Sequence, residues 1–148
     1  VIASMQPSFE WFWGGPDGMY ASRLGQRWKR TNRLRDVLDG GLVIAGGSDT
    51  NVTPPEPLLG IHAAVNLPNP AQRVSVSEAL RMFTIDAAYS AFNENRMGSI
   101  SPGKEASFAV LSRDILSVPP DTIHQTRVLE TWFRGRRVYE RSSPTKAR

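Results

Sequence analysis

The chain has 148 residues, of which 40% are hydrophobic and 22% are charged, and its formal net charge is +4. This balance is typical of a globular domain with one core and excludes collagen-like or disordered composition. The sequence has no apolar run of membrane-spanning length and no cysteine, which excludes a disulfide framework and a Cys-ligated zinc site. We therefore expect no membrane partner and a cytoplasmic location.

The first five residues, VIASM, have the apolar character of a strand, and the nearby Pro7 suits a strand end. Residues 8–20, SFEWFWGGPDGMY, join a run of aromatic residues to the turn-forming GGPDG, and this pattern predicts a long loop. Because the chain opens in a strand without an initiator methionine, we expect it to be a fragment of a longer protein.

A helix is predicted from Asn32, which can cap it, to the Gly40-Gly41 stop. The unbroken apolar run Leu42 to Ala45 follows and is typical of a strand covered on both faces. The order of strand, loop, helix and strand predicts an α/β fold with a parallel sheet.

Two further helices are expected. One covers Leu58 to Val65, after the proline-rich TPPEP. The other runs from about Val76 to Phe92, because Ser75 and Glu78 have the spacing of a capping box. Its apolar stripe consists of Leu80, Phe83, Ala87 and Ala91.

The pattern changes near residue 98. SPGKEASFAVL indicates a turn into a strand, and RVLETWFRGRRVYE indicates a hairpin about Arg134-Gly135, so antiparallel structure is expected here. The sequence therefore divides into residues 1–98, residues 99–141 and a flexible tail of residues 142–148.

Asp49 is the main candidate for chemistry, since it stands just past the strand in LVIAGGSD. Reactive groups of α/β folds collect at the carboxyl ends of the strands, where a carboxylate can bind a metal ion or transfer a proton. The alternative is that Asp49 only caps the turn before the prolines.

Other residues have open alternatives. Trp11 and Trp13 can line a substrate pocket or anchor their loop, and Gln6 can bind a substrate carbonyl or satisfy backbone groups. His62 and His124 are interpreted as structural residues rather than ligands.

Basic residues gather between Arg23 and Arg35. No nucleic-acid recognition motif accompanies them, so we interpret them as a solvated face and expect no nucleic-acid partner.

Several motifs in order, LVIAGGSD, EPLLGIHAAV, SVSEALRMFTIDAAYSAF and MGSISPGKEASFAVLSRDIL, resemble the C-terminal part of the metal-dependent amidohydrolases. The likeness is to amidohydrolase family 3, which includes N-substituted formamide deformylases. It implies the last two strand–helix units of a (β/α)8 barrel, with residues 99–141 joining a small composite β-sandwich. It also implies hydrolysis of non-peptide C–N bonds with a divalent metal, commonly zinc, and Asp49 as metal ligand and proton carrier.

The chain departs from the resembling family in two ways. Gln6 and Pro7 are followed by Ser8 and Phe9, where relatives often carry QPxH, and the His-x-His of the first barrel strand has no counterpart. We therefore expect little or no metal in this chain alone, and a partner in the missing barrel portion or in self-association. The expected substrate is a small amide-type molecule. The alternative function is a non-catalytic interaction or regulatory module.

Overall fold

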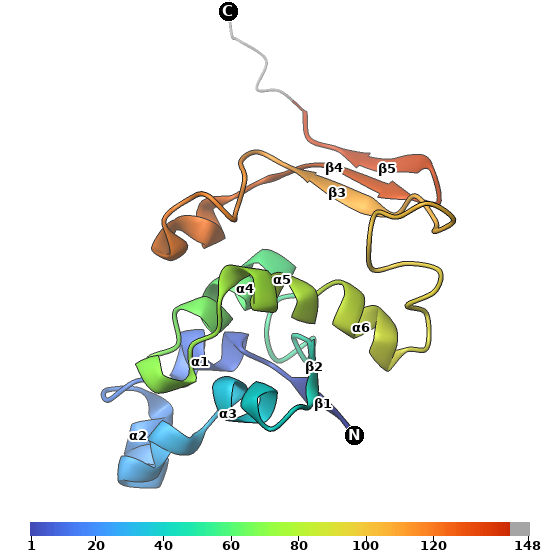
Figure 1. The fold of residues 1–148 in the computed structure, drawn as a ribbon. Coiled ribbons are helices and arrows are strands. Elements are labelled where there is room, and N and C mark those ends of the chain that lie inside the picture. Colours follow the sequence, from blue (N-terminus) through green and yellow to red (C-terminus); the bar gives the residue numbers. More distant parts are fainter. Residues whose placement is uncertain (143–148) are drawn as a thin grey trace, which may run out of the picture.

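The computed structural model describes residues 1–142, so the expected flexibility of residues 143–148 lies outside the described residues. The strands are β1 (Ile2–Met5), β2 (Val43–Gly46), β3 (Phe108–Leu111), β4 (Val128–Phe133) and β5 (Arg136–Glu140). The α-helices are α1 (Ser8–Trp13), α2 (Met19–Leu24), α3 (Leu34–Asp39), α4 (Pro57–Val65), α5 (Val76–Met82) and α6 (Ile85–Ser90). Three 3₁₀ segments are η1 (Gly25–Arg30), η2 (Pro70–Gln72) and η3 (Pro120–Gln125) (Figure 1). Within residues 1–142, no helix is long and apolar enough to cross a membrane.

Strands β1 and β2 pair in parallel, as the sequence predicts. The register runs from Ile2 opposite Val43 to Met5 opposite Gly46. One further bond, from the Gly47 N–H to the Met5 carbonyl at 2.9 Å, extends the ladder past the strand ends. The carboxyl ends of both strands therefore lie at one edge, which is where the segments after Met5 and Gly46 begin.

The expected loop over residues 8–20 is wrong at both ends, because residues 8–13 form helix α1 and helix α2 begins at Met19. Phe9 and Trp13 lie four residues apart, and their rings meet edge to face at a centroid distance of 5.1 Å. Such i,i+4 pairs stabilise a helix. The helix ends at Gly14, where the turn-forming GGPDG begins. The sequence pattern thus predicted this turn but not the helix before it.

The predicted cap at Asn32 is also wrong. Helix α3 begins at Leu34, and Asn32 has a left-handed φ of 42°. Its side chain instead donates to Glu10 Oε1 at 3.1 Å, so it ties the start of α3 to α1. The glycine stop is confirmed at Gly41, whose φ of 73° is a backbone conformation that glycine adopts without penalty.

The single helix predicted from Val76 to Phe92 is broken into α5 and α6. At the break the Phe83 ring lies against two glycines, Gly46 at the end of β2 and Gly60 in α4. A Cβ added to Gly46 would come within 2.6 Å of the ring, and one added to Gly60 would overlap it. The packing of Phe83 therefore fits a strand end and a helix that carry no side chain there. Beyond α6 the predicted stripe fails, since Ala91 is exposed.

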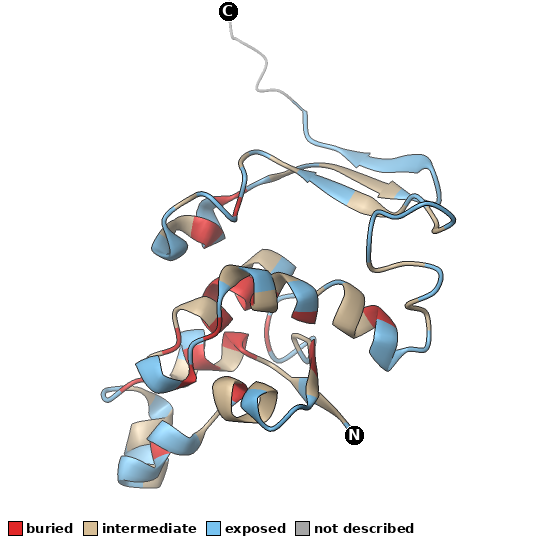
Figure 2. Ribbon diagram, in the orientation of Figure 1, coloured by how far each residue is buried: buried red, intermediate tan, exposed pale blue. Residues whose placement is uncertain are grey.

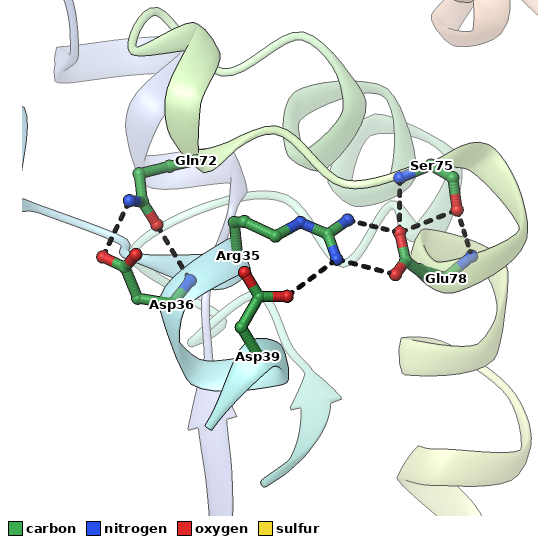
Figure 3. Close-up of polar contacts among 6 residues, drawn as sticks. All are labelled: Arg35, Asp36, Asp39, Gln72, Ser75 and Glu78. Carbon is green, nitrogen blue, oxygen red and sulfur yellow. Dashed lines mark hydrogen bonds and ion pairs between the residues drawn. The ribbon is translucent and has the colours of Figure 1, made fainter. Parts of the chain in front are cut away.

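The predicted capping box of α5 is confirmed and extends into an ion pair. Ser75 N–H donates to Glu78 Oε2 at 2.7 Å, and Glu78 N–H donates to Ser75 Oγ at 3.2 Å. The same carboxylate accepts two bonds from Arg35 of α3, at 2.9 and 2.6 Å (Figure 3). Beside it, Gln72 Nε2 donates to Asp36 Oδ2 at 2.7 Å. These bonds hold α3 against the segment that leads into α5.

The second sheet is antiparallel in the order β3-β4-β5, as expected. In Figure 1 it lies beyond α4 and α5 from the parallel pair. Buried residues gather on α4, α5 and β2, and β5 is exposed along its length (Figure 2). The main hydrophobic cluster contains Leu34, Ile44, Ile61, Ala64, Leu67, Val74, Ala79, Met82, Ile115 and Ile123. Because Ile115 and Ile123 belong to it, one core joins the segment after β3 to the helices of the first part.

We predict that Gly60→Ala lowers the free energy of unfolding by about 1–3 kcal/mol, because the new methyl group overlaps the Phe83 ring. Denaturant unfolding measures it. In a Phe83→Leu background the same change is expected to cost clearly less, because the ring atoms that it meets are absent. An equal cost in both backgrounds would place its cause elsewhere.

We also predict an acid-dependent loss of stability at Glu78. The Arg35 bonds hold the pKa of this carboxyl at about 2, against its ordinary 4.5. A pKa lowered by folding stabilises the fold above the ordinary value, and this contribution is lost as the pH falls from about 4.5 towards 2. Because both side chains are about one-third exposed, we expect about 1 kcal/mol for Glu78→Gln at pH 7.

The matched control for Glu78→Gln is Arg81→Gln, which breaks the ion pair of Asp86 with the exposed side chain of Arg81. We expect it to change the free energy of unfolding by less than about 0.5 kcal/mol. Urea titrations at pH 7 and pH 3 measure the free energy of unfolding of both variants. In Glu78→Gln this free energy is expected to differ less between the two pH values than in the wild type. If the wild-type protein has the same free energy of unfolding at pH 7 and at pH 3, the proposed contribution of the Glu78 carboxylate is contradicted.

Candidate active site

The edge formed by the carboxyl ends of β1 and β2 brings together two of the predicted residues. Gln6 follows β1 directly, and its side-chain Nε2 lies 3.8 Å from the position of a Cβ on Gly47. Gly47 follows β2, and two residues later comes Asp49. The Gln6 amide therefore lies beside Gly47, next to the loop that carries Asp49.

Asp49 lies in a tight loop and is exposed. Its φ is 51°, and its carbonyl accepts a bond from Val52 N–H at 2.6 Å. The loop is otherwise held by its neighbours: Ser48 Oγ and Thr50 Oγ1 are 2.7 Å apart, and buried Thr53 donates its hydroxyl to the Ser48 carbonyl. Within residues 1–142 the Asp49 carboxylate makes no hydrogen bond, so the turn is closed without it.

Trp11 and Trp13 pack against aromatic side chains of the protein. The half-exposed Trp11 ring packs against His62 and His124, at centroid distances of 4.7 and 5.6 Å. Trp13 contacts Phe9 and lies 6.0 Å from the ring of Phe12. These contacts fit the anchoring alternative, and a substrate contact of either residue stays a prediction.

Sequence reasoning missed Glu10, which is buried although it lies in an aromatic run. Its carboxylate accepts the bond from Asn32. Burial, and then the negative charge of Glu10, raise the pKa of the Tyr20 phenol. The signal in the sequence is a single charged residue between aromatic ones on a short helix. Glu10 fixes α1, and with it the segment that leaves the strand edge after Gln6.

The described residues do not make a metal centre by themselves. Within residues 1–142, no group of three His, Asp or Glu side chains is placed to hold a metal ion. A catalytic zinc ion typically has three protein ligands, and the strand edge offers the one carboxylate of Asp49. His62 and His124 contact each other between α4 and η3 instead.

Two shallow surface hollows lie away from this edge. One of about 380 Å³ is bounded by the segment from Pro16 to Trp28, and one of about 370 Å³ by the segment from Ile100 to Phe108. Neither is lined by Asp49 or Gln6. These two hollows are therefore separate from the candidate site.

Several known proteins are similar in sequence to nearly the whole chain. The amidohydrolase YtcJ of Bacillus subtilis is 34% identical over 131 residues, which are 81% of this chain and 25% of that protein. The N-substituted formamide deformylase of Arthrobacter pascens is 29% identical over 92% of this chain and 26% of its own length. The protein LONG AFTER FAR-RED 3 of Arabidopsis thaliana is 32% identical over 94% of this chain. The chain thus spans about a quarter of the length of these relatives.

Solved structures agree with the α/β fold. An uncharacterized metal-dependent hydrolase from Pyrococcus horikoshii superposes with a TM-score of 0.68 at 24% identity, over 81% of this chain and 26% of that one. One from Pyrococcus furiosus gives a TM-score of 0.61 at 29% identity, over 72% of this chain and 22% of that one. A sequence profile described as the amidohydrolase family matches residues 1–139. On that match, the chain belongs to the amidohydrolase family.

Proposed function

We propose that this chain is the C-terminal part of a metal-dependent hydrolase that cleaves non-peptide C–N bonds. The observation that carries the proposal is the exposed Asp49 carboxylate, which follows β2 at the edge of a parallel pair and takes no part in the bonds of its loop. The family match over residues 1–139 supports the reaction class.

The proposed architecture has β1 and β2 as the last two strands of a (β/α)8 barrel and residues 99–141 as part of a composite β-sandwich. It is supported by the change from parallel pairing in the first sheet to antiparallel pairing in the second. A barrel sets its reactive groups at the carboxyl ends of its strands, which is the edge where Gln6 and Asp49 begin their segments.

In this proposal Asp49 acts as a general base and then as a general acid. Its carboxylate accepts a proton from the attacking water and gives it to the nitrogen of the leaving amine. Exposure at the strand edge keeps the carboxylate accessible to both groups. We also propose it as one ligand of a divalent metal, zinc, in the complete enzyme, the other ligands coming from the rest of the protein.

The proposed substrate is a small amide or formamide. The similarity to a protein named N-substituted formamide deformylase supports this class. Gln6 is proposed to donate its amide N–H to the substrate carbonyl, since its side chain lies beside Gly47 at the strand edge. Trp11 and Trp13 are proposed to give apolar contacts, and the cytoplasm is the proposed location.

A second candidate is a non-catalytic interaction or regulatory module. It is favoured by one observation, the absence of a group of three metal-binding side chains within residues 1–142. In that case the open strand edges of β1 and β2 serve to bind a partner or a second copy of the chain.

We predict that Asp49→Asn in the protein that carries the chain lowers kcat for amide hydrolysis by at least about 100-fold, because the amide cannot carry the proton. Circular dichroism and the melting temperature are expected to stay unchanged. The matched control is Asp17→Asn, which removes another exposed carboxylate away from the strand edge and is expected to keep full activity. Substantial turnover by Asp49→Asn would refute the role.

We predict that the purified 148-residue chain holds far less than one zinc ion per molecule. The physical reason is that residues 1–142 hold no group of three His, Asp or Glu side chains placed to bind a metal ion. Elemental analysis after dialysis measures this, with the longer protein as the loaded reference. One tightly held zinc ion per isolated chain would contradict the prediction and reveal a ligand set within it.

A further inference from the structure

The two histidines of the sequence lie against each other, although they are 62 residues apart. His62, on α4, is buried with 2% of its surface exposed, and His124, on η3, is exposed. Their Nδ1 atoms are 3.4 Å apart and their ring centroids 4.4 Å apart. One neutral imidazole can donate to the other at this distance, while two imidazolium ions would repel each other.

The surroundings of His62 favour its neutral form. Its Nδ1 lies 3.2 Å from Asn66 Nδ2 and 3.3 Å from the Pro120 carbonyl oxygen. Its Nε2 is buried and has no hydrogen-bond partner within the described residues. An imidazolium carries a proton on both nitrogens, so the charged ring would leave one buried N–H unsatisfied.

Few charged groups face His62. Burial, and then the nearness of His124, lower its pKa, while the Pro120 carbonyl and Asp121 act in the opposite direction. His124 and Asp121 both belong to η3, and α1 presents the uncharged Trp11 ring. Asp121 is exposed, so water screens its charge and weakens the compensation.

The same contact attaches η3 to the rest of the molecule. Ile123, next to His124, is fully buried in the main core cluster, and Trp11 of α1 packs on both imidazoles. Helix α1 begins two residues after Gln6, at the strand edge. The histidine pair therefore contacts residues of two parts of the chain. These are η3, in the 99–141 segment, and α1, which follows Gln6 of the candidate site.

We propose that His62 and His124 form an acid-sensitive latch that fastens η3 to α4. The latch is closed while the buried imidazole of His62 is neutral and opens when it takes up a proton. The sign follows from linkage: a histidine that is harder to protonate in the closed form stabilises that form above its ordinary pKa of about 6.5, and this stabilisation is lost as the pH falls. Opening releases Ile123 and Trp11 together.

Hydrogen exchange followed by mass spectrometry tests the latch, with labelling times adjusted so that the chemical exchange rate is matched at each pH. From pH 7.5 to pH 5.5 we expect protection of the peptide over residues 120–126 to fall by up to about tenfold, which is the limit for one histidine that stays neutral while the latch is closed. The peptide over residues 34–39 is the internal control, because α3 lies apart from the histidines, and its protection is expected to stay constant.

His62→Phe is the variant of choice, since it keeps an aromatic ring beside Trp11 and removes the titrating group. It is expected to keep η3 protected at both pH values. His124→Gln removes only the exposed partner, so a smaller fall is expected to remain from the burial of His62. If His62→Phe does not fold, the imidazole pKa values of the wild-type protein, measured by NMR, decide the question.

Three results would overturn the proposal. The first is η3 protection in the wild type that does not change with pH. The second is a fall of the same size in His62→Phe, which would assign the effect to other groups. The third is an NMR pKa of His62 at or above the ordinary value.

Discussion

The packing of Phe83 against two glycines is the constraint on which the candidate site depends. Gly46 ends β2 and Gly60 lies in α4, and the ring occupies the space that a side chain at either position would take. Close packing makes such a contact intolerant of even one added methyl group. Gly46 is the last residue of β2 and Asp49 follows three residues later, so Phe83, between α5 and α6, packs at the strand end that leads into the candidate site.

A second link holds the helices on the other side of the strands. Arg35 of α3 reaches Glu78 of α5, which also closes the capping box with Ser75 (Figure 3). The Glu78 carboxylate thus accepts the free backbone N–H at the start of α5 and also binds the Arg35 guanidinium of α3. Because bidentate bonds to a guanidinium fix orientation as well as distance, this link holds α3 and α5 in register around the buried strand β2.

Local chemistry in the sequence predicted most of the regular elements. Both parallel strands, the capping box at Ser75 and the hairpin about Arg134 follow from patterns within a few residues. Two of the failures depend on distant residues. Asn32 stands one residue before the N-cap position of α3 and its Nδ2 donates to Glu10, and the helix after Val76 breaks where Phe83 meets glycines of β2 and α4. At the site, the sequence predicted that Asp49 follows a strand, but not that Ser48, Thr50 and Thr53 close the loop without its carboxylate.

Helix α4 connects these features within a few residues. Its start at Pro57 closes the segment that carries Asp49, Gly60 receives the Phe83 ring, and His62 meets η3 two residues further on. Gly60 and His62 are both buried, so the helix cannot shift at one contact and keep the other unchanged. A protonation event at His62 therefore takes place two residues from the Gly60 contact, where the Phe83 ring packs against the end of β2.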